Sequence, residues 1–177
     1  AFLSETDDVL PVIQPGASDS AALGQTFEVL VRAGRSAPMA KTLLIPEAWS
    51  KRADVMPQSW QALYGYCNAV MEPWDGPAAI AAFDGRWAIA GLDRNGLRPM
   101  RYSLTHDGML IVGSETGMAP VEAERSAGRG AGAPGRLTAL DLVEGRFYRE
   151  PEILVELAKS GPYERWLESV EDIEPVV

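Results

Sequence analysis

Asp-Gly and Asn-Gly pairs at short intervals in the middle of the chain constrain its fold more than any other feature. Asp84-Gly85, Asn95-Gly96 and Asp107-Gly108 fall between short runs that are almost entirely apolar. Such pairs are the strongest local signal for β-hairpins, because these residues tolerate the positive φ angles of tight turns. They predict an antiparallel meander with strands at 78–83, 87–92, 100–104 and 109–113. Since runs such as "AAIAAF" do not alternate with polar residues, we expect both faces of this sheet to be covered.

Helical periodicity precedes the meander. Residues 18–34 place apolar side chains on one helical face, after the N-cap types Ser18, Asp19 and Ser20 and before the stop signal Gly34. A second long helix is expected to begin at Pro57, after a polar connection at 51–56. Further helices are predicted at 39–44, 152–159 and 163–170. A Gly/Ala/Arg-rich loop is predicted at 124–136, and a hairpin is predicted from strands at 137–142 and 146–148. The elements together predict one α+β domain over residues 1–177, with helices packed on an antiparallel sheet.

Composition narrows the classes of partner. The chain has 177 residues, enough for one sizeable core, and a formal net charge of −9 at pH 7. This charge argues against nucleic acid or an anionic membrane as the main partner, and no apolar run approaches the ~20 residues of a membrane span. The single cysteine excludes an internal disulfide and a multi-cysteine metal site, which is consistent with a cytoplasmic location.

Asp19 is the first candidate for a binding residue. It lies where a carboxylate stabilises the start of a helix, by about 0.5–2 kcal/mol for a cap. The same carboxylate can hold a cationic group such as a substrate ammonium, and the two roles are compatible. A second candidate is the cluster Arg94, Arg98 and Arg101 in "GLDRNGLRPMRY", which is either an anion site or an ordinary hairpin that spreads these side chains to both faces.

The other reactive residue types favour structural roles. Cys67 lies on the apolar stripe of the second long helix, and His106 lies in a predicted turn, so the pair does not suggest a nucleophile and its base. Trp74 is interpreted as a packing residue and Asp75 as a turn acid. The glycine-rich stretch 126–136 lacks the spacing and the Lys-Ser/Thr of a phosphate-binding loop. No metal-ligand cluster and no complete catalytic apparatus is visible, so we expect no catalytic residue and no metal site in this chain.

Several longer strings resemble the glutamine amidotransferase domain of the glutamate synthase large subunit. They are "SDSAAL" leading into "FEVLVRAGRS", then "LIPEAW", "MEPWDGPAAIAAFDGRWAIAGLDRNGLRPMRY" and "DGMLIVGSETG". The resemblance runs from about residue 18 to residue 148. It implies an N-terminal-nucleophile hydrolase fold, a four-layer α/β/β/α sandwich of which this chain would form the C-terminal part.

The resemblance also implies a reaction and its setting. An N-terminal cysteine attacks the side-chain amide of L-glutamine, releasing ammonia, with its own α-amino group as the base. The ammonia passes to a synthase domain of the same polypeptide, which carries FMN and an iron–sulfur cluster and converts 2-oxoglutarate to glutamate. A small electron-donor subunit is a further implied partner, and the donor itself, NADPH, NADH or ferredoxin, stays open. No cofactor is expected in this segment.

Among the family's site residues, the resemblance carries over Asp19 of "SDS", which in the family binds the α-amino group of glutamine. The family's nucleophile and its Asn-Gly oxyanion motif belong to a segment before Ser18 that has no counterpart here, since residue 1 is Ala1 and Asn95-Gly96 belongs to the predicted hairpin. The loop at 128–133 also departs from the family's string. We therefore expect the isolated chain to be inactive as a glutaminase.

Two alternatives remain open from the sequence. One is a degenerate amidotransferase-like module that binds or scaffolds without catalysis. The other is a domain of a different class II amidotransferase, such as one that acts on a phosphoribosyl or sugar acceptor.

Overall fold

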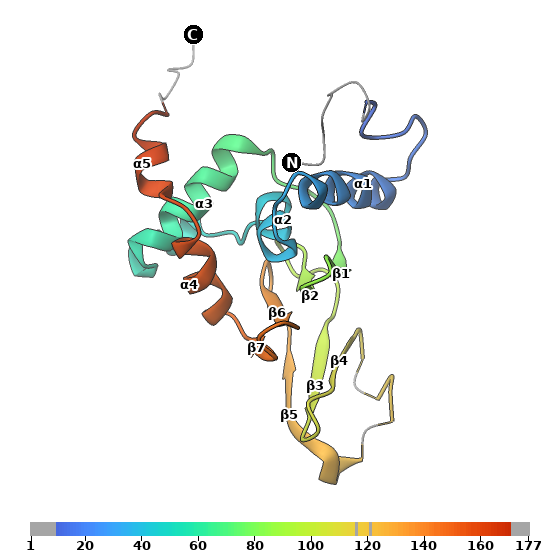
Figure 1. Ribbon diagram of the computed structural model, residues 1–177. Helices are drawn as coiled ribbons and strands as arrows, with labels where there is room; N and C mark the ends of the chain where they lie inside the picture. Colours follow the sequence, from blue (N-terminus) through green and yellow to red (C-terminus); the bar gives the residue numbers. More distant parts are fainter. Residues whose placement is uncertain (1–9, 116, 121, 171–177) are drawn as a thin grey trace.

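The computed structural model describes residues 10–115, 117–120 and 122–170 (Figure 1). Most helices gather at one end of the molecule, a four-stranded sheet lies beneath them, and a three-stranded sheet extends away from them. The helices are α1 (Asp19–Arg32), α2 (Ala37–Leu44), α3 (Gln58–Val70), α4 (Glu152–Lys159) and α5 (Tyr163–Leu167), with 3-10 turns η2 (Ser50–Val55) and η3 (Ala123–Arg125). The chain is thus α+β with antiparallel strands, as predicted, and its strands form two sheets.

The larger sheet has the strand order β1-β2-β6-β7, and the smaller sheet has the order β4-β3-β5. The strands are β1 (Ala79–Phe83), β2 (Trp87–Leu92), β3 (Arg101–Thr105), β4 (Leu110–Gly113), β5 (Ser126–Ala131), β6 (Leu137–Asp141) and β7 (Arg146–Tyr148). All pairs are antiparallel, and β2 joins two distant parts of the chain by pairing with β6 in the register Trp87↔Asp141 to Gly91↔Leu137.

The prediction of a single meander is wrong at its centre. The hairpins β1–β2 and β3–β4 form as predicted, but β2 pairs with β6 and not with β3. Residues 93–100 between them carry the chain from one sheet to the other. The Asn95-Gly96 turn is present, with Gly96 at φ 65°, yet it ends a strand without starting a hairpin.

Two further predictions about strands need correction. The 124–136 stretch is not a loop throughout, because residues 126–131 form β5 beside β3. Both faces of the first strand were expected to be covered, but alternate residues of β1 are exposed in the described structure. Phe83, for example, is 63% exposed. The predicted polar connection at 51–56 largely forms η2.

The helices form where the apolar stripes predicted them, and two begin with serine caps. The Ser18 hydroxyl accepts a hydrogen bond from the N–H of Ala21 at 3.3 Å, and the Ser36 hydroxyl accepts one from Met39 at 3.4 Å. The main core lies where α2, α3 and α4 pack on the larger sheet. Its fully buried members include Leu63, Tyr64, Cys67, Ala139 and Ile153.

Lys41 of α2 is the one lysine among the fully buried side chains of the described structure, with 1% exposure. Its stem crosses the backbone of β2 at Gly91, where a Cβ atom would lie 2.9 Å from Lys41 Cε and 3.0 Å from the carbonyl oxygen of Arg136. A glycine is therefore required at position 91 for α2 to approach the sheet this closely.

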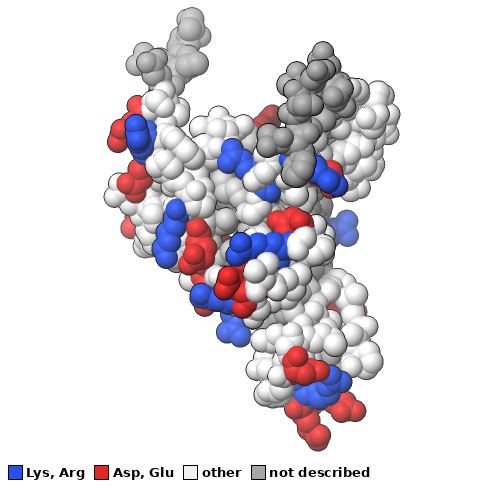
Figure 2. All heavy atoms as spheres, viewed as in Figure 1, with Lys and Arg blue, Asp and Glu red and all other residues white. Residues whose placement is uncertain are grey.

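Charged side chains of both signs are interspersed on the face drawn in Figure 2. The described residues on this face form no extended basic surface.

Candidate functional site

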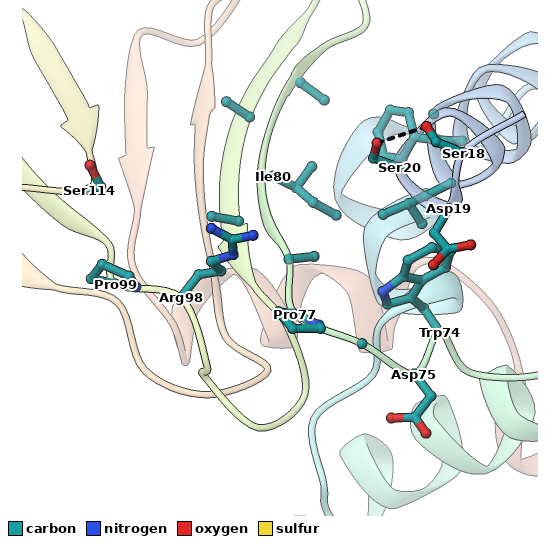
Figure 3. A pocket seen from close by; sticks show the side chains of 18 of the residues that line it. Ser18, Asp19, Ser20, Trp74, Asp75, Pro77, Ile80, Arg98, Pro99 and Ser114 are labelled. Atoms are coloured by element: carbon teal, nitrogen blue, oxygen red, sulfur yellow. Dashed lines mark hydrogen bonds between the residues drawn. The ribbon is translucent and has the colours of Figure 1, made fainter.

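A cavity of about 960 Å³ opens between the start of α1, strand β1 with the segment before it, and two turns of the smaller sheet (Figure 3). The largest contribution comes from residues 74–82. The rest of the lining comes from Ser18, Asp19, Ser20, Leu23, Gly24 and Phe27 on one side, and from Arg98, Pro99, Ser114 and Glu115 on the other. Polar groups thus stand at the two ends of a largely apolar wall, which is the usual composition of a small-molecule site.

Asp19 is the first residue of α1, and its side chain lies at the helix end of the cavity. The cap itself is Ser18, not Asp19, so the carboxylate is not used to cap the helix. It forms no ion pair with any described residue and is exposed. An exposed carboxylate at a fixed helix position, left without a cationic partner among the described residues, is suited to bind a positively charged ligand group.

Trp74 forms the wall next to Asp19. Its backbone N–H donates to the carbonyl of Leu44 at 2.7 Å, and its ring packs on a small cluster made by Leu23, Leu44 and Ile45. Its indole Nε1 is buried and has no hydrogen-bond acceptor within the described structure. The predicted packing role of Trp74 is confirmed. Asp75 is exposed, and Figure 3 shows its carboxylate directed away from the cavity.

The three arginines of the 91–102 stretch do not converge on one site. Arg98 lines the large cavity, whereas Arg101 lines a separate small cavity of about 20 Å³, and Arg94 lines neither. The hairpin that was expected to spread these side chains to both faces does not form, because β2 pairs with β6 and not with β3, yet the three arginines still do not form one anion site. The structure brings Asp19 and Arg98 to the same cavity from opposite sides.

Comparison with known proteins identifies the family of this chain. The family of glutamine amidotransferases class-II matches residues 1–166. The chain belongs to this family.

The relatives of this amidotransferase chain include glutamate synthases of three kinds. The NADPH glutamate synthase large chain of Azospirillum brasilense is 47% identical over 177 residues, which is 100% of this chain and 12% of that protein. The NADH glutamate synthase of Schizosaccharomyces pombe is 41% identical over 168 residues, 94% of this chain and 8% of that protein. The ferredoxin-dependent glutamate synthase 2 of Arabidopsis thaliana is 37% identical over 172 residues, 96% of this chain and 11% of that protein. The chain therefore spans about a tenth of the length of these relatives.

Cys67 is the one cysteine of the amidotransferase sequence, and it is inaccessible. It is 0% exposed in the main core, and burial raises the pKa of its thiol to about 12. A buried thiol of this kind is not a nucleophile at neutral pH. His106 lies in the exposed turn after β3, so the predicted structural roles of both residues are confirmed.

A buried charged cluster between α2 and the larger sheet was not predicted from the sequence. The Lys41 ammonium donates hydrogen bonds to the carbonyl oxygens of Ile45, at 2.9 Å, and of Gly135. Glu150 lies in the same region with Arg136 Nε 2.8 Å from its Oε2. Burial lowers the pKa of Lys41 to about 8 and raises the pKa of Glu150 to about 7, against the opposing effect of neighbouring opposite charges. The sequence signal that could have predicted the buried lysine is the single charged residue within the apolar helical stretch "PMAKTLLI".

The described residues contain no group of three or more His, Cys, Asp or Glu side chains arranged to hold a metal ion. Within the same residues, the helices are too short or too polar to cross a membrane.

Proposed function

We propose that this chain is part of the glutaminase domain of a glutamate synthase, in which L-glutamine is hydrolysed to glutamate and ammonia. The ammonia is then used by a synthase site elsewhere in the polypeptide to form glutamate from 2-oxoglutarate. Family membership and the names of the relatives support this assignment over other class II amidotransferases. Residues 1–177 act within one domain of that enzyme.

The observation that carries the proposal is the position of Asp19. Its carboxylate stands at one end of an apolar cavity without a cationic partner among the described residues. The α-ammonium of glutamine is a cation that needs a charged hydrogen-bond acceptor when it leaves water. Asp19 binds this ammonium and thereby fixes the α-carbon end of the substrate, while the aliphatic part of glutamine lies along the wall of β1.

The nucleophile of the reaction comes from outside this sequence. Its single cysteine, Cys67, lies in the core and away from the cavity lining. The residues present also do not fit an iron–sulfur cluster, because such clusters need several accessible cysteine thiolates. We propose that the cluster and FMN belong to the synthase part of the enzyme, and that this chain contributes substrate binding.

The test is Asp19→Asn in the full-length enzyme. Charged hydrogen bonds contribute about 1.5–3 kcal/mol, so the KM for glutamine should rise roughly 10- to 100-fold. Glutamate formation from added ammonia should stay unchanged, because ammonia bypasses the glutamine site. The matched control is Glu28→Gln, which removes a carboxylate of the same helix that is ion-paired with Arg32 at the surface and does not line the cavity. Equal glutamine kinetics in Asp19→Asn and the unmodified enzyme would contradict the proposal.

A further inference from the structure

Asp93 lies at the end of β2, where the chain leaves the larger sheet, and its side chain is 1% exposed. Its carboxylate accepts hydrogen bonds from four backbone N–H groups. They are those of Ala78 at 3.1 Å, Asn95 at 3.0 Å, Leu97 at 3.1 Å and Arg98 at 3.4 Å. The donors belong to two separate segments, the residue before β1 and the turn after β2.

These two segments are neighbouring parts of the cavity lining. Pro77 and Ala78 line it just before β1, and Arg98 and Pro99 line it after β2. The backbone of Asp93 adds to the same connection, because its N–H donates to the carbonyl of Ala78 at 2.8 Å and its carbonyl accepts from Gly135 at 2.7 Å. Asp93 itself does not line the cavity, so it acts on the cavity only through the segments that it holds.

The ionised carboxylate is stable in this position. Burial alone would raise the pKa of Asp93, but the surrounding backbone N–H groups bring it below the ordinary value. A neutral side chain at this position would leave buried N–H donors without a full acceptor, at a cost that favours rearrangement of both segments.

We propose that Asp93 is a positioning residue that fixes the Pro77–Ala78 segment relative to the Arg98–Pro99 segment in the lining of the glutamine cavity. The proposal rests on the proposed function, because the cavity is taken to hold glutamine. It also assigns a role to the "LDRNGLRP" stretch, which was interpreted from the sequence as either an anion site or a hairpin.

The test compares Asp93→Asn with Asp141→Asn in the full-length enzyme. Asp141 is an equally buried carboxylate that accepts from Arg86 and from the N–H groups of Val143 and Glu144. It lies at the opposite end of β2, paired with Trp87, and away from the cavity lining. Both variants should lower the melting temperature. Only Asp93→Asn should raise the KM for glutamine, roughly tenfold, because small displacements of binding groups have large effects. The kcat of the glutaminase reaction and ammonia-dependent synthesis should be kept.

An unchanged KM in Asp93→Asn, or an equal rise in both variants, overturns the proposal, because the second result would mean general loosening of the sheet. If Asp93→Asn does not fold, hydrogen exchange in the unmodified enzyme replaces it. Saturating L-glutamate, the product, should slow exchange at residues 77–79 and 94–98 and leave residues 142–145 unchanged; equal exchange with and without L-glutamate overturns the proposal. A KM effect in Asp93→Asn without one in Asp19→Asn would keep the role of Asp93 and remove that of Asp19.

Discussion

Three buried carboxyl groups lie at the ends of strands in the larger sheet, yet their pKa values shift in different directions. Hydrogen bonds from Arg86 lower the pKa of Asp141, and backbone N–H groups outweigh burial to lower that of Asp93. Arg136 forms an ion pair with Glu150 but no aligned hydrogen bond to its Oε2, so burial dominates and raises the pKa of Glu150 to about 7. The number of hydrogen-bond donors around each carboxylate therefore decides its charge, and that number depends on tertiary structure.

The raised pKa of Glu150 predicts a specific pH dependence of stability. The unfolded carboxyl titrates near 4.5 and the folded one near 7, so between these values the folded chain holds a proton that the unfolded chain has lost. The contribution of Glu150 to the free energy of unfolding should therefore be largest below about pH 4.5. It should fall as the pH rises to about pH 7, by an amount on the order of 3 kcal/mol. Urea denaturation across this range should show the fall in the unmodified chain and a much smaller one in Glu150→Gln.

Glu156→Gln serves as the control, because Glu156 is an exposed residue of α4 whose carboxylate forms only a surface ion pair, 3.6 Å from the Lys159 ammonium. Its pH profile should match that of the unmodified chain. A profile of Glu150→Gln with the same slope as the unmodified chain would show that another group causes the fall.

Single residues of the site differ in how far they could be predicted. Asp19 stood out because a carboxylate next to a helix-start serine is a local pattern, and the structure places it in the cavity. Asp93 and Lys41 did not stand out as functional or buried groups, because each has one partner that is a backbone group of a distant segment, Ala78 for Asp93 and Gly135 for Lys41. Asp-Arg-Asn-Gly is a sufficient turn signal by itself, which concealed the connection to Ala78.

At the scale of elements, periodicity predicted the helices and both hairpins of the central region, but strand β5 was missed. Its sequence, "SAGRGA", has few of the β-branched and aromatic residues typical of strands. The reason for the glycines lies in β3. Tyr102 pairs with Gly130, and a Cβ atom at Gly130 would collide with the ring of Tyr102. Tyr102 in turn packs against Phe147 of β7, with ring centroids 5.5 Å apart, so this small residue permits a contact between the two sheets.

This packing predicts opposite responses at two glycines of β5. Gly130→Ala should destabilise the chain by about 1–3 kcal/mol, because the methyl group forces Tyr102 away from Phe147. Gly128→Ala on the same strand should be neutral or slightly stabilising, since the new Cβ would meet only Arg149 at 3.8 Å and alanine restricts the unfolded chain. Urea denaturation of both variants measures the difference. A loss in Gly128→Ala as large as that in Gly130→Ala would attribute the effect to strand propensity and not to Tyr102.

At the scale of the whole molecule, the sheet arrangement was the least predictable feature. Hairpin signals are local, whereas the pairing of β2 with β6 joins residues about fifty positions apart, and no short motif encodes it. The prediction of continuous hairpins therefore merged two sheets into one. The four-layer sandwich implied by the family resemblance stays a prediction, as does the extent of the domain.

The core that contains Cys67 leads to a prediction for the isolated chain. Because its one thiol is buried in the main core between helices and sheet, the purified 177-residue chain should release no ammonia from glutamine. A thiol-reactive disulfide dye should leave the native chain unlabelled and react with one thiol per chain in denaturant. Val70→Cys, at a 51% exposed position of the same helix, should react at once and serves as the positive control. Ammonia release by the isolated chain would contradict the proposal that the nucleophile lies outside this sequence.

The close crossing of Lys41 over Gly91 has a consequence for how this sequence can diverge. A side chain at position 91 meets both the lysine stem and the Arg136 carbonyl, so relief requires a change in α2 as well as in β2. Replacement of Lys41 by a shorter residue would remove one of the two obstacles. It would also leave the carbonyl oxygens of Ile45 and Gly135 without their hydrogen-bond donor. Either substitution alone should lower the stability of the fold. Positions 41 and 91 should therefore change together in evolution, and an alignment of amidotransferase domains should show them as a covarying pair.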